Sequence, residues 1–505
     1  MLDIAKLEEE IKEEQQNSDK QPKTMNELYI LLQQLGKAWR EENAYIVNEG
    51  QKNERTVTPQ PNVSTVAKVL EKHCHFTFIG EGAISDISKL YIYHLDLGYY
   101  VSSDDVFRKL LLKYDNRLTS NKFFTELIAY IRTETKIQPP LSDYRYIPVA
   151  NGVYNIQTKQ LEEFTPKFII TSKVKTAYNP YAKKPILGGW FDFDKWLATL
   201  TCGDEELVTL LWQVMNEAIN PNRTRKKMVL LVGDGNNGKG TFQALLENLI
   251  GRENISNLKP GQFGKEFYLG ALEGKVCNIG DDISNKYLDE VSDLMSVVSG
   301  DPVQVNKKGK QPVEARFKLL CVFSGNDLPN ARNKTNGWYR RLCIIPFNAD
   351  FNGEVERPEI KDEFIKDKAL LEWVLFKILN MADFDKFIEP KAVKEKLTSY
   401  KNDNDYIKVW VENYYIPNGW HEVNHVPMFI ARNKLKEFAE DLGIDKPKLG
   451  QFSKAVITEL ERNTGNEYKA KNGTVAREFY DVIDPHGFHR DRFVKGVWGI
   501  GLIKK

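Results

Sequence analysis

Hydrophobic and polar positions follow different periods along the chain, and in its middle part they predict strands that alternate with helices. Short apolar runs without polar interruption are typical of strands buried on both faces, as in a parallel sheet. The four such runs are VLLV (229–232), VCNIGDD (276–282), LLCVFSGN (319–326) and RLCIIPF (341–347). Helical patterns lie between them, and LLEWVLFKILNM (370–381) closes the region. The alternation predicts a parallel, helix-covered sheet from about residue 205 to residue 385.

The amino-terminal part has mixed patterns. Residues 1–24 are polar and mostly acidic, which predicts a frayed helix or a disordered tail. Residues 63–138 combine strand-like and helix-like runs, and residues 190–220 have helical spacing. Asn151-Gly152 lies between two β-rich runs, which is a hairpin signal.

The carboxyl-terminal segment 406–505 predicts a separate small domain. IARNKLKEFAEDLG (430–443) is a helical pattern with a glycine stop, and KLGQFSKAVITELER (448–462) is a second helix after a turn. Two strand-like runs follow, on either side of Asn472-Gly473. Helix, turn, helix and hairpin, in this order, predict a winged-helix domain.

A chain of 505 residues is too long for one hydrophobic core, because single cores stop growing at roughly 250–300 residues. We therefore expect an α/β protein of several domains: a parallel-sheet core, an α/β amino-terminal region and a carboxyl-terminal winged helix. The expected boundaries are 1–140 for an amino-terminal accessory domain, 141–204 for a connecting region, 205–390 for the parallel-sheet domain, 391–405 for a linker helix and 406–505 for the winged helix.

Composition excludes several classes of protein. The net charge is +1, so any binding of nucleic acid has to rest on local patches. The five cysteines are scattered without a CxxC pair, which argues against a disulfide framework or a zinc ribbon. No apolar run approaches the ~20 residues of a membrane span, and the first residues lack the apolar stretch of a signal peptide. We therefore expect a cytoplasmic protein without a membrane partner.

A glycine-rich turn carries the clearest chemical signal. The apolar run 229–232 leads into GDGNNGK, which fits the GxxxxGK core of a Walker A loop. Backbone N–H groups must reach phosphate oxygens there, and side chains would block the approach. A helix that begins near Lys239 directs its N-terminal dipole at the phosphates, and Lys239 supplies a positive charge to the β and γ oxygens. The residues expected to hold ATP are Gly233, Gly235, Asn236, Asn237, Gly238, Lys239, Gly240 and Thr241.

The residue after the lysine departs from the motif. A Walker A loop carries Ser or Thr there to hold Mg²⁺, whereas this chain has Gly240 followed by Thr241. Either Thr241 reaches the metal or its water shell, or Mg²⁺ depends on Asp281 and Asp282, which end the second apolar run. In a P-loop ATPase one such carboxylate binds Mg²⁺ and the other can polarise the attacking water. Asn326, at the end of the third run, is a candidate to hydrogen-bond the γ-phosphate or that water.

Together these motifs resemble a superfamily 3 (AAA+) helicase of the phage and plasmid primase-helicase type, over roughly residues 140–385. The motifs that carry the resemblance, in order, are GDGNNGK, the strand ending in Asp281-Asp282, GDPVQVNKKGKQP, FSGNDLP and RRLCIIPF. The segment IPVANGVYNIQT also resembles the region that precedes the motor in this family. Within the family, the chain looks most like the replication initiator helicases (Rep) of staphylococcal pathogenicity islands and related mobile elements.

The resemblance implies a P-loop AAA+ motor that forms a hexameric ring, with ATP between neighbouring subunits. An arginine finger from the neighbour would stabilise the transferred phosphoryl group, which is worth roughly 10³–10⁵ in rate in well-studied NTPases. Arg340 and Arg341 are both candidates for this finger, with a slight preference for Arg341. The basic turn with Lys307, Lys308 and Lys310 resembles the hairpin that projects into the channel of the ring, where lysines grip a phosphate backbone without reading sequence.

The predicted winged helix offers a second set of candidate DNA contacts. A winged helix places its second helix in the major groove, which here brings Lys448, Gln451 and Lys454 to the DNA. The predicted wing carries Lys469 and Lys471. Winged helices also serve protein contacts, so the fold alone leaves that role open. Our hypothesis is that this domain recognises the replication origin and loads the ring there.

The leading hypothesis is an ATP- and Mg²⁺-dependent hexameric DNA helicase that initiates replication of a mobile genetic element. It would bind the origin duplex through its carboxyl-terminal domain and unwind DNA by translocating on one strand. The alternative is an ATP-switched DNA-binding or scaffold protein that does not translocate. A small-molecule kinase is a third reading of GKGT, which the later motifs disfavour. A separate primase and other replication proteins are further candidate partners.

Overall fold

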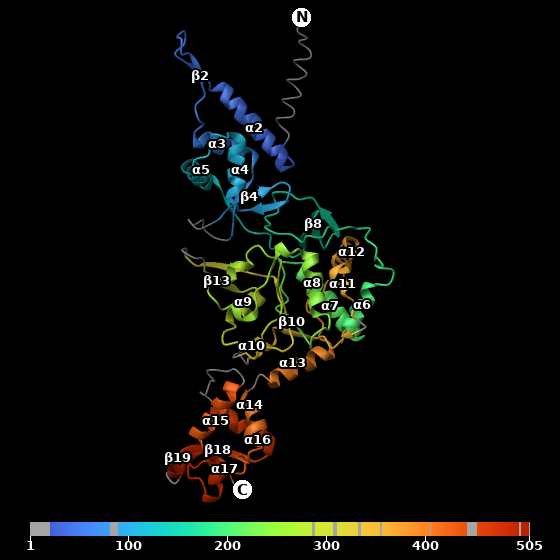
Figure 1. Ribbon diagram of the computed structural model, residues 1–505, viewed down its shortest axis with the longest axis vertical. Coiled ribbons are helices and arrows are strands. Elements are labelled where there is room, and N and C mark those ends of the chain that lie inside the picture. Colours follow the sequence, from blue (N-terminus) through green and yellow to red (C-terminus); the bar gives the residue numbers. More distant parts are fainter. Residues whose placement is uncertain are drawn as a thin grey trace.

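The computed structural model describes residues 21–80, 89–284, 288–306, 311–331, 335–353, 356–403, 406–441, 452–493 and 496–503. An amino-terminal part, a central body and a carboxyl-terminal part follow one another along the long axis of the molecule (Figure 1). Among the described helices, none combines the length and the apolar character needed to cross a membrane.

The central body is built on a five-stranded sheet in which all paired strands are parallel, in the order β11–β12–β15–β10–β16. The strands are β10 (Met228–Val232), β11 (Ile255–Ser256), β12 (Cys277–Gly280), β15 (Leu320–Gly325) and β16 (Leu342–Pro346). The four apolar runs form four of these strands, which confirms the predicted parallel sheet. The edge strand β11 was not predicted, because two residues are too few to show a period.

Hydrophobic cores cover both faces of this sheet. On β10, Val229 and Leu231 belong to one core, whereas Leu230 and Val232 belong to the other. Successive residues of a strand point to opposite faces, so the alternation places β10 between two layers of helices. The first layer contains α6 (Phe193–Leu200), α7 (Glu205–Ala218), α8 (Lys239–Ile250) and α12 (Lys368–Leu379), and the second contains α9 (Ser292–Ser299) and α10 (Asn336–Tyr339).

The segment expected as a linker forms helix α13 (Lys391–Asp403), which packs on the central body. Leu397 and Tyr400 lie in the core on the second face of the sheet. The Tyr400 hydroxyl donates a hydrogen bond of 2.8 Å to the Pro329 carbonyl. This helix therefore packs against the central body and is not an isolated linker between two domains.

A separate hairpin, β13 (Pro302–Val305) and β14 (Val313–Arg316), extends from the second face. Val303 and Val305 alternate with exposed residues and anchor β13 in the core. The two antiparallel strands predicted on either side of the basic turn are thereby confirmed. The turn itself, with Lys307, Lys308 and Lys310, lies outside the described residues.

The amino-terminal part packs helices on a small four-stranded sheet of order β5–β4–β3–β6. Its elements are α2 (Met25–Glu42), α3 (Val63–His73), β3 (Phe76–Ile79), β4 (Leu90–His94), β5 (Tyr99–Val101), α4 (Asp104–Tyr114), α5 (Asn121–Glu134) and β6 (Ile137–Gln138). A two-stranded arm, β1 (Tyr45–Val47) and β2 (Arg55–Val57), projects from it (Figure 1). A three-stranded meander, β7 (Tyr146–Val149), β8 (Gly152–Asn155) and β9 (Gln160–Glu162), leads to the central body, and its first turn is the predicted hairpin at Asn151.

The carboxyl-terminal part has its own hydrophobic core and a three-stranded antiparallel sheet of order β17–β19–β18. Its elements are α14 (Tyr406–Trp410), β17 (Val426–Pro427), α15 (Met428–Asp441), α16 (Phe452–Thr464), β18 (Glu467–Gly473), α17 (Tyr480–Ile483), α18 (Arg490–Phe493) and β19 (Val497–Ile503). The two predicted helices correspond to α15 and α16, but the strands that follow them are connected differently from the prediction.

The predicted hairpin at Asn472-Gly473 is wrong. Strand β18 continues through both residues and pairs with β19, so Gly473 lies opposite Val497. A Cβ atom on Gly473 would lie 2.7 Å from Nδ1 of the buried His425. Glycine is therefore required for close packing on an imidazole ring and not for a turn. The following residues form α17 instead of a second strand.

Candidate active site

The glycine loop (residues 233–238) connects the carboxyl end of β10 to the first residue of α8. Asn236 and Gly238 have left-handed backbones, with φ of 53° and 85°. A Cβ atom on Gly238 would lie 2.3 Å from Leu200, and one on Gly233 would lie 2.1 Å from the Phe347 carbonyl oxygen. Gly233 and Gly238 are thus required by close contacts, and the loop turns its backbone toward the start of the helix.

Asn237 holds this loop in place from within, because only 3% of its surface is exposed. Its Nδ2 donates to the carbonyl oxygens of Phe347, at 3.0 Å, and Asp234. Its Oδ1 accepts a hydrogen bond of 3.0 Å from Nζ of Lys239. Asn237 therefore connects the loop both to the end of β16 and to the lysine.

Lys239 is buried at the first position of α8, and its ammonium group faces the loop rather than the solvent. Nζ donates to the carbonyl oxygens of Gly233 at 2.5 Å and Asp234 at 2.8 Å. Burial lowers the pKa of Lys239, and the carboxylates of Asp234 and Asp281 oppose this shift. The end of β12, where Asp281 lies, is at the same edge of the sheet as the lysine, because β12 and β10 both pair in parallel with β15.

The acidic pair follows β12 at the same edge of the sheet, since carboxyl ends of parallel strands meet there. Oδ1 of Asp281 accepts hydrogen bonds from the Ser324 hydroxyl and from the backbone N–H of Asp282, the latter at 2.8 Å. Asp282 has a left-handed backbone, with φ of 48°, and both carboxylates are exposed. Asn326, exposed, follows the end of β15. The structure therefore brings the glycine loop, Asp281, Asp282 and Asn326 to one edge.

Arg340 and Arg341 lie at the opposite edge, where β16 begins. The Arg341 carbonyl accepts a hydrogen bond of 2.7 Å from the N–H of Met228, the first residue of β10. Since β10 has five residues, roughly 16 Å of strand at ~3.3 Å per residue separates these arginines from the glycine loop. Neither arginine reaches the loop of its own chain.

The two arginines differ in their surroundings. Arg341 is 9% exposed, and its guanidinium donates to the Ser299 hydroxyl at 2.7 Å and to the Gly337 carbonyl at 2.5 Å. Arg340 caps helix α10 and is exposed. The slight preference for Arg341 as a projecting arginine therefore does not suit the geometry, which favours Arg340.

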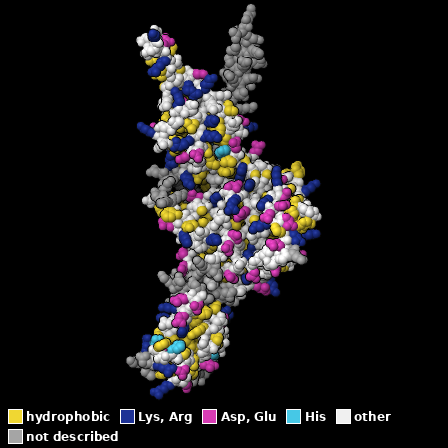
Figure 2. Space-filling view, in the orientation of Figure 1, with side chains coloured by type: hydrophobic (Ala, Val, Ile, Leu, Met, Phe, Trp, Pro, Cys, Tyr) yellow, Lys and Arg dark blue, Asp and Glu magenta, His cyan; other side chains and the backbone are white. Residues whose placement is uncertain are grey.

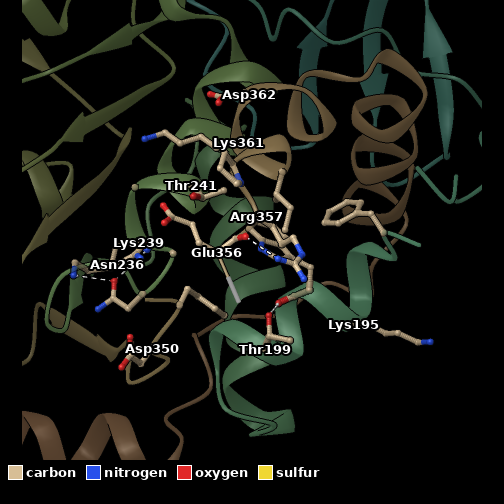
Figure 3. A pocket seen from close by; sticks show the side chains of 18 of the residues that line it. Lys195, Thr199, Asn236, Lys239, Thr241, Asp350, Glu356, Arg357, Lys361 and Asp362 are labelled. Carbon is tan, nitrogen blue, oxygen red and sulfur yellow. Dashed lines mark hydrogen bonds between the residues drawn. The ribbon is translucent and has the colours of Figure 1, made fainter. Parts of the chain in front are cut away.

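A cleft of about 830 Å³ opens beside the glycine loop (Figure 3). One wall is the loop and the start of α8, including Gly240 and the half-buried Thr241. The aromatic side chains of Trp190 and Trp196 line a second wall, ahead of and within α6. The third wall is formed by residues 350–351 and 356–362, which include α11 (Pro358–Asp362).

The segment 350–362 was not among the predicted site residues. It brings Glu356, Arg357 and Lys361 into the cleft, and the Phe351 N–H donates to the Asn236 carbonyl at 3.0 Å. No motif marks these residues. A topological rule would have found them, because the chain leaving β16 must emerge at the same edge as the chain leaving its parallel neighbour β10.

The groups at this edge suit the phosphates of a nucleotide, but they supply only some of the ligands that Mg²⁺ needs. Backbone N–H groups at the start of α8, Lys239 and Lys361 suit phosphate oxygens. Both described donors to Asp281 go to Oδ1, so Oδ2 is the oxygen that would be available to a cation. Within the described residues, no three His, Cys, Asp or Glu side chains converge on a preformed metal site. Phosphate oxygens and water would therefore complete the coordination shell of Mg²⁺, as is usual for this ion.

The candidate DNA-binding lysines are only partly described. Lys448 and Gln451 lie outside the described residues, as do the three lysines of the basic turn. Lys454 is exposed on α16. Lys469 and Lys471 are exposed on β18 and lie opposite Gly501 and Gly499 of β19. Figure 2 shows basic and acidic side chains interspersed over one face of the central body, in keeping with the small net charge.

Comparisons with known proteins point in one direction. The family described as "D5 N terminal like" matches residues 20–202, and a family of unknown function, DUF5906, matches residues 231–341. The first match includes most of the amino-terminal region, for which no motif indicates a role.

Two viral proteins are relatives at low identity. Putative helicase 184R of Invertebrate iridescent virus 6 is 22% identical over 245 residues, which is 45% of this chain and 25% of that protein. Putative helicase 121R of Invertebrate iridescent virus 3 is 24% identical over 181 residues, which is 33% of this chain and 19% of that protein. This chain thus spans a quarter or less of the length of these relatives.

Solved structures of the NrS-1 C-terminal region align over 88% of this chain and 100% of theirs, with TM-scores of 0.46 and 0.45 and sequence identities of 13% and 14%. The family match and the viral relatives together support a relationship with phage and viral primase-helicases.

Proposed function

We propose that this chain is an ATP-dependent DNA helicase and replication initiator with a superfamily 3 AAA+ motor in its central body. The observation that carries the proposal is the joint placement of the glycine loop, Lys239 and Asp281 at one edge of a parallel sheet, with a cleft of about 830 Å³ beside the loop and Lys239. A cleft of this size accommodates a nucleoside triphosphate. The finer kinship, to Rep proteins of staphylococcal pathogenicity islands, rests on the motifs alone.

In this proposal each side chain acts on the triphosphate or the water that attacks it. Lys239 exchanges its loop carbonyls for the β and γ oxygens, and the N–H groups at the start of α8 bind the same phosphates. Mg²⁺ neutralises charge on those oxygens when it is bound. Asp281 and Asp282 hold the metal and orient water, while Asn326 hydrogen-bonds the γ-phosphate or that water.

A ring of subunits follows from the position of the arginines. A finger must touch the γ-phosphate, yet Arg340 lies at the far edge of the sheet from its own glycine loop. A second copy of the chain would have to supply it, as in a hexamer with ATP at each subunit interface. Exposure supports Arg340 for this role, because the contacts of Arg341 are made within its own chain.

For DNA binding, we propose the turn of the β13–β14 hairpin in the channel and the carboxyl-terminal part at the origin. Lys469 and Lys471 support the second site, because they are exposed on one face of β18 opposite two glycines of β19. A phosphate backbone could approach both ammonium groups there. These lysines would then contact DNA from strand β18, which is paired with β19, and not from the predicted wing.

The test uses the full chain and the variant Lys239→Ala. The helicase proposal expects ATPase activity that single-stranded DNA stimulates, and displacement of a strand from a forked duplex, both lost in the variant. ATP hydrolysis and DNA binding without strand displacement would favour an ATP-switched scaffold. Phosphorylation of a small molecule without stimulation by DNA would favour a kinase. Unwinding that survives Lys239→Ala would refute the assignment of the site.

A further inference from the structure

Ser324 is a buried polar residue within FSGNDLP, and no role follows for it from that motif. It lies on β15, between β10 and β12, with 2% of its surface exposed. Its hydroxyl donates a hydrogen bond of 2.5 Å to Oδ1 of Asp281 on the neighbouring strand. An apolar residue would suit a central strand better, unless the hydroxyl has a task at the end of β12.

We infer that Ser324 is a positioning residue that orients the Asp281 carboxylate toward the divalent cation of a bound Mg²⁺–nucleotide complex. The inference rests on the proposed function of this site. Ser324 donates to Oδ1, and the N–H of Asp282 donates to the same oxygen. Two donors on one oxygen hold the plane of the carboxylate and leave Oδ2 as the oxygen for the cation.

The backbone that follows this contact is tightly packed against β15. Beyond the end of β12, the N–H of Ile283 donates to the Ser324 carbonyl at 2.8 Å. A Cβ atom on Gly325 would lie 2.9 Å from the Ile283 side chain. Asp282, between the two contacts, adopts its left-handed backbone. Ser324 therefore holds Asp281 by its side chain and the following chain by its carbonyl.

The sequence at the start of α8 makes this contact more important. With Gly240 after the lysine, the chain lacks a hydroxyl at the position where Walker A loops hold the metal. Ser324 does not replace that hydroxyl as a ligand, because it is buried and already donates to Asp281. Instead it orients the carboxylate of Asp281, which remains as a metal ligand. Such partners of metal ligands typically change metal affinity or activity about 10- to 100-fold when removed.

The experiment measures binding of a fluorescent ATP analogue to the full chain while Mg²⁺ is titrated. For Ser324→Ala, we expect the Mg²⁺ concentration for half-maximal binding to rise about tenfold or more. Binding of the analogue in EDTA should stay within about twofold of wild type, because the glycine loop and Lys239 are unchanged. Excess Mg²⁺ should restore the lost binding. Ser324→Cys, which is similar in size but a weak donor, should behave like Ser324→Ala.

The matched control is Ser256→Ala. Ser256 is also buried in this sheet, and its hydroxyl donates to Oδ1 of Asn278 on β12 at 2.9 Å, away from Asp281. It should leave the Mg²⁺ requirement unchanged. An unchanged Mg²⁺ requirement in Ser324→Ala, or an equal shift in Ser256→Ala, overturns the inference. If the wild-type chain binds no ATP analogue at any Mg²⁺ concentration, the proposed function fails instead.

Discussion

Asn237→Ala tests the internal support of the glycine loop. The substitution removes four hydrogen bonds: two from Nδ2 to the carbonyls of Phe347 and Asp234, and two that Oδ1 accepts from the ammonium group and the backbone N–H of Lys239. Neutral hydrogen bonds contribute about 0.5–1.5 kcal/mol each and charged ones about 1.5–3 kcal/mol. Lys239 keeps two carbonyl partners, so we expect the loop to lose about 2–4 kcal/mol of local stability rather than the full sum.

Amide hydrogen exchange is the appropriate assay, because a chain with several cores does not unfold in one step. A loss of 2–4 kcal/mol corresponds to exchange about 30- to 700-fold faster at the start of α8. ATP affinity should fall as well, since the backbone donors are no longer held together. Asn237→Asp should lose ATP binding too, because its carboxylate retains Lys239 while facing two carbonyl oxygens without a donor.

Asn236→Gly is the control for this pair. Asn236 is adjacent in the loop but exposed, and its side chain makes one hydrogen bond of 3.1 Å to Asn352. Glycine accepts its left-handed backbone without strain. Exchange at the start of α8 should change less than about fivefold, as expected for one exposed hydrogen bond of under 1 kcal/mol. Equal effects of Asn237→Ala and Asn236→Gly, or wild-type exchange in both, would contradict the reasoning.

Three further predictions concern the cleft, the arginines and the carboxyl-terminal sheet. Lys361→Ala should weaken ATP binding about tenfold, as expected for one charge-assisted hydrogen bond of about 1.5 kcal/mol. Equilibrium titration with a fluorescent ATP analogue measures this affinity, and an unaltered affinity would exclude Lys361 from the phosphate site. Arg340→Ala should reduce ATPase turnover about 10³-fold or more without changing amide hydrogen exchange at the start of β16. Arg341→Ala should accelerate exchange there, because its two internal hydrogen bonds are lost. The reverse pattern would return the finger to Arg341. Replacing Lys469 and Lys471 by alanine should reduce the slope of log DNA affinity against log salt by about 1.8, and an unchanged slope would show that this face does not contact phosphates.

Local sequence predicted those parts of the fold whose cause is local. The apolar run of β10 leads directly into the glycine loop and Lys239, and the same residues determine both the strand and the turn. Parallel pairing then follows from four buried strands with helices between them. The predicted strands and the first turn of α8 therefore needed no knowledge of distant residues.

The features that the sequence did not predict depend on distant contacts. Asn472-Gly473 is a turn signal in isolation, but the buried ring of His425 uses Gly473 for close packing within a strand. Arg341 resembles a projecting arginine in the sequence, yet Ser299 and the α10 backbone hold it inside. Lys361 carries no motif, and only the return of the chain after β16 brings it to the cleft.

Gly240 departs from the local motif, and a distant residue, Lys361, lies beside it. Its backbone is not in the left-handed region, and the one atom near a Cβ built on it is Nζ of Lys361, at 3.8 Å. Neither strain nor packing therefore requires glycine at this position, although the motif expects a hydroxyl there. A hydroxyl beside Lys361 would offer that ammonium a hydrogen-bond partner, whereas glycine leaves it directed at the phosphate side of the cleft. In the proposed site, the metal therefore depends more on Asp281, which Ser324 holds in place. The Lys361 ammonium group is then available to the nucleotide as a second positive charge besides Lys239.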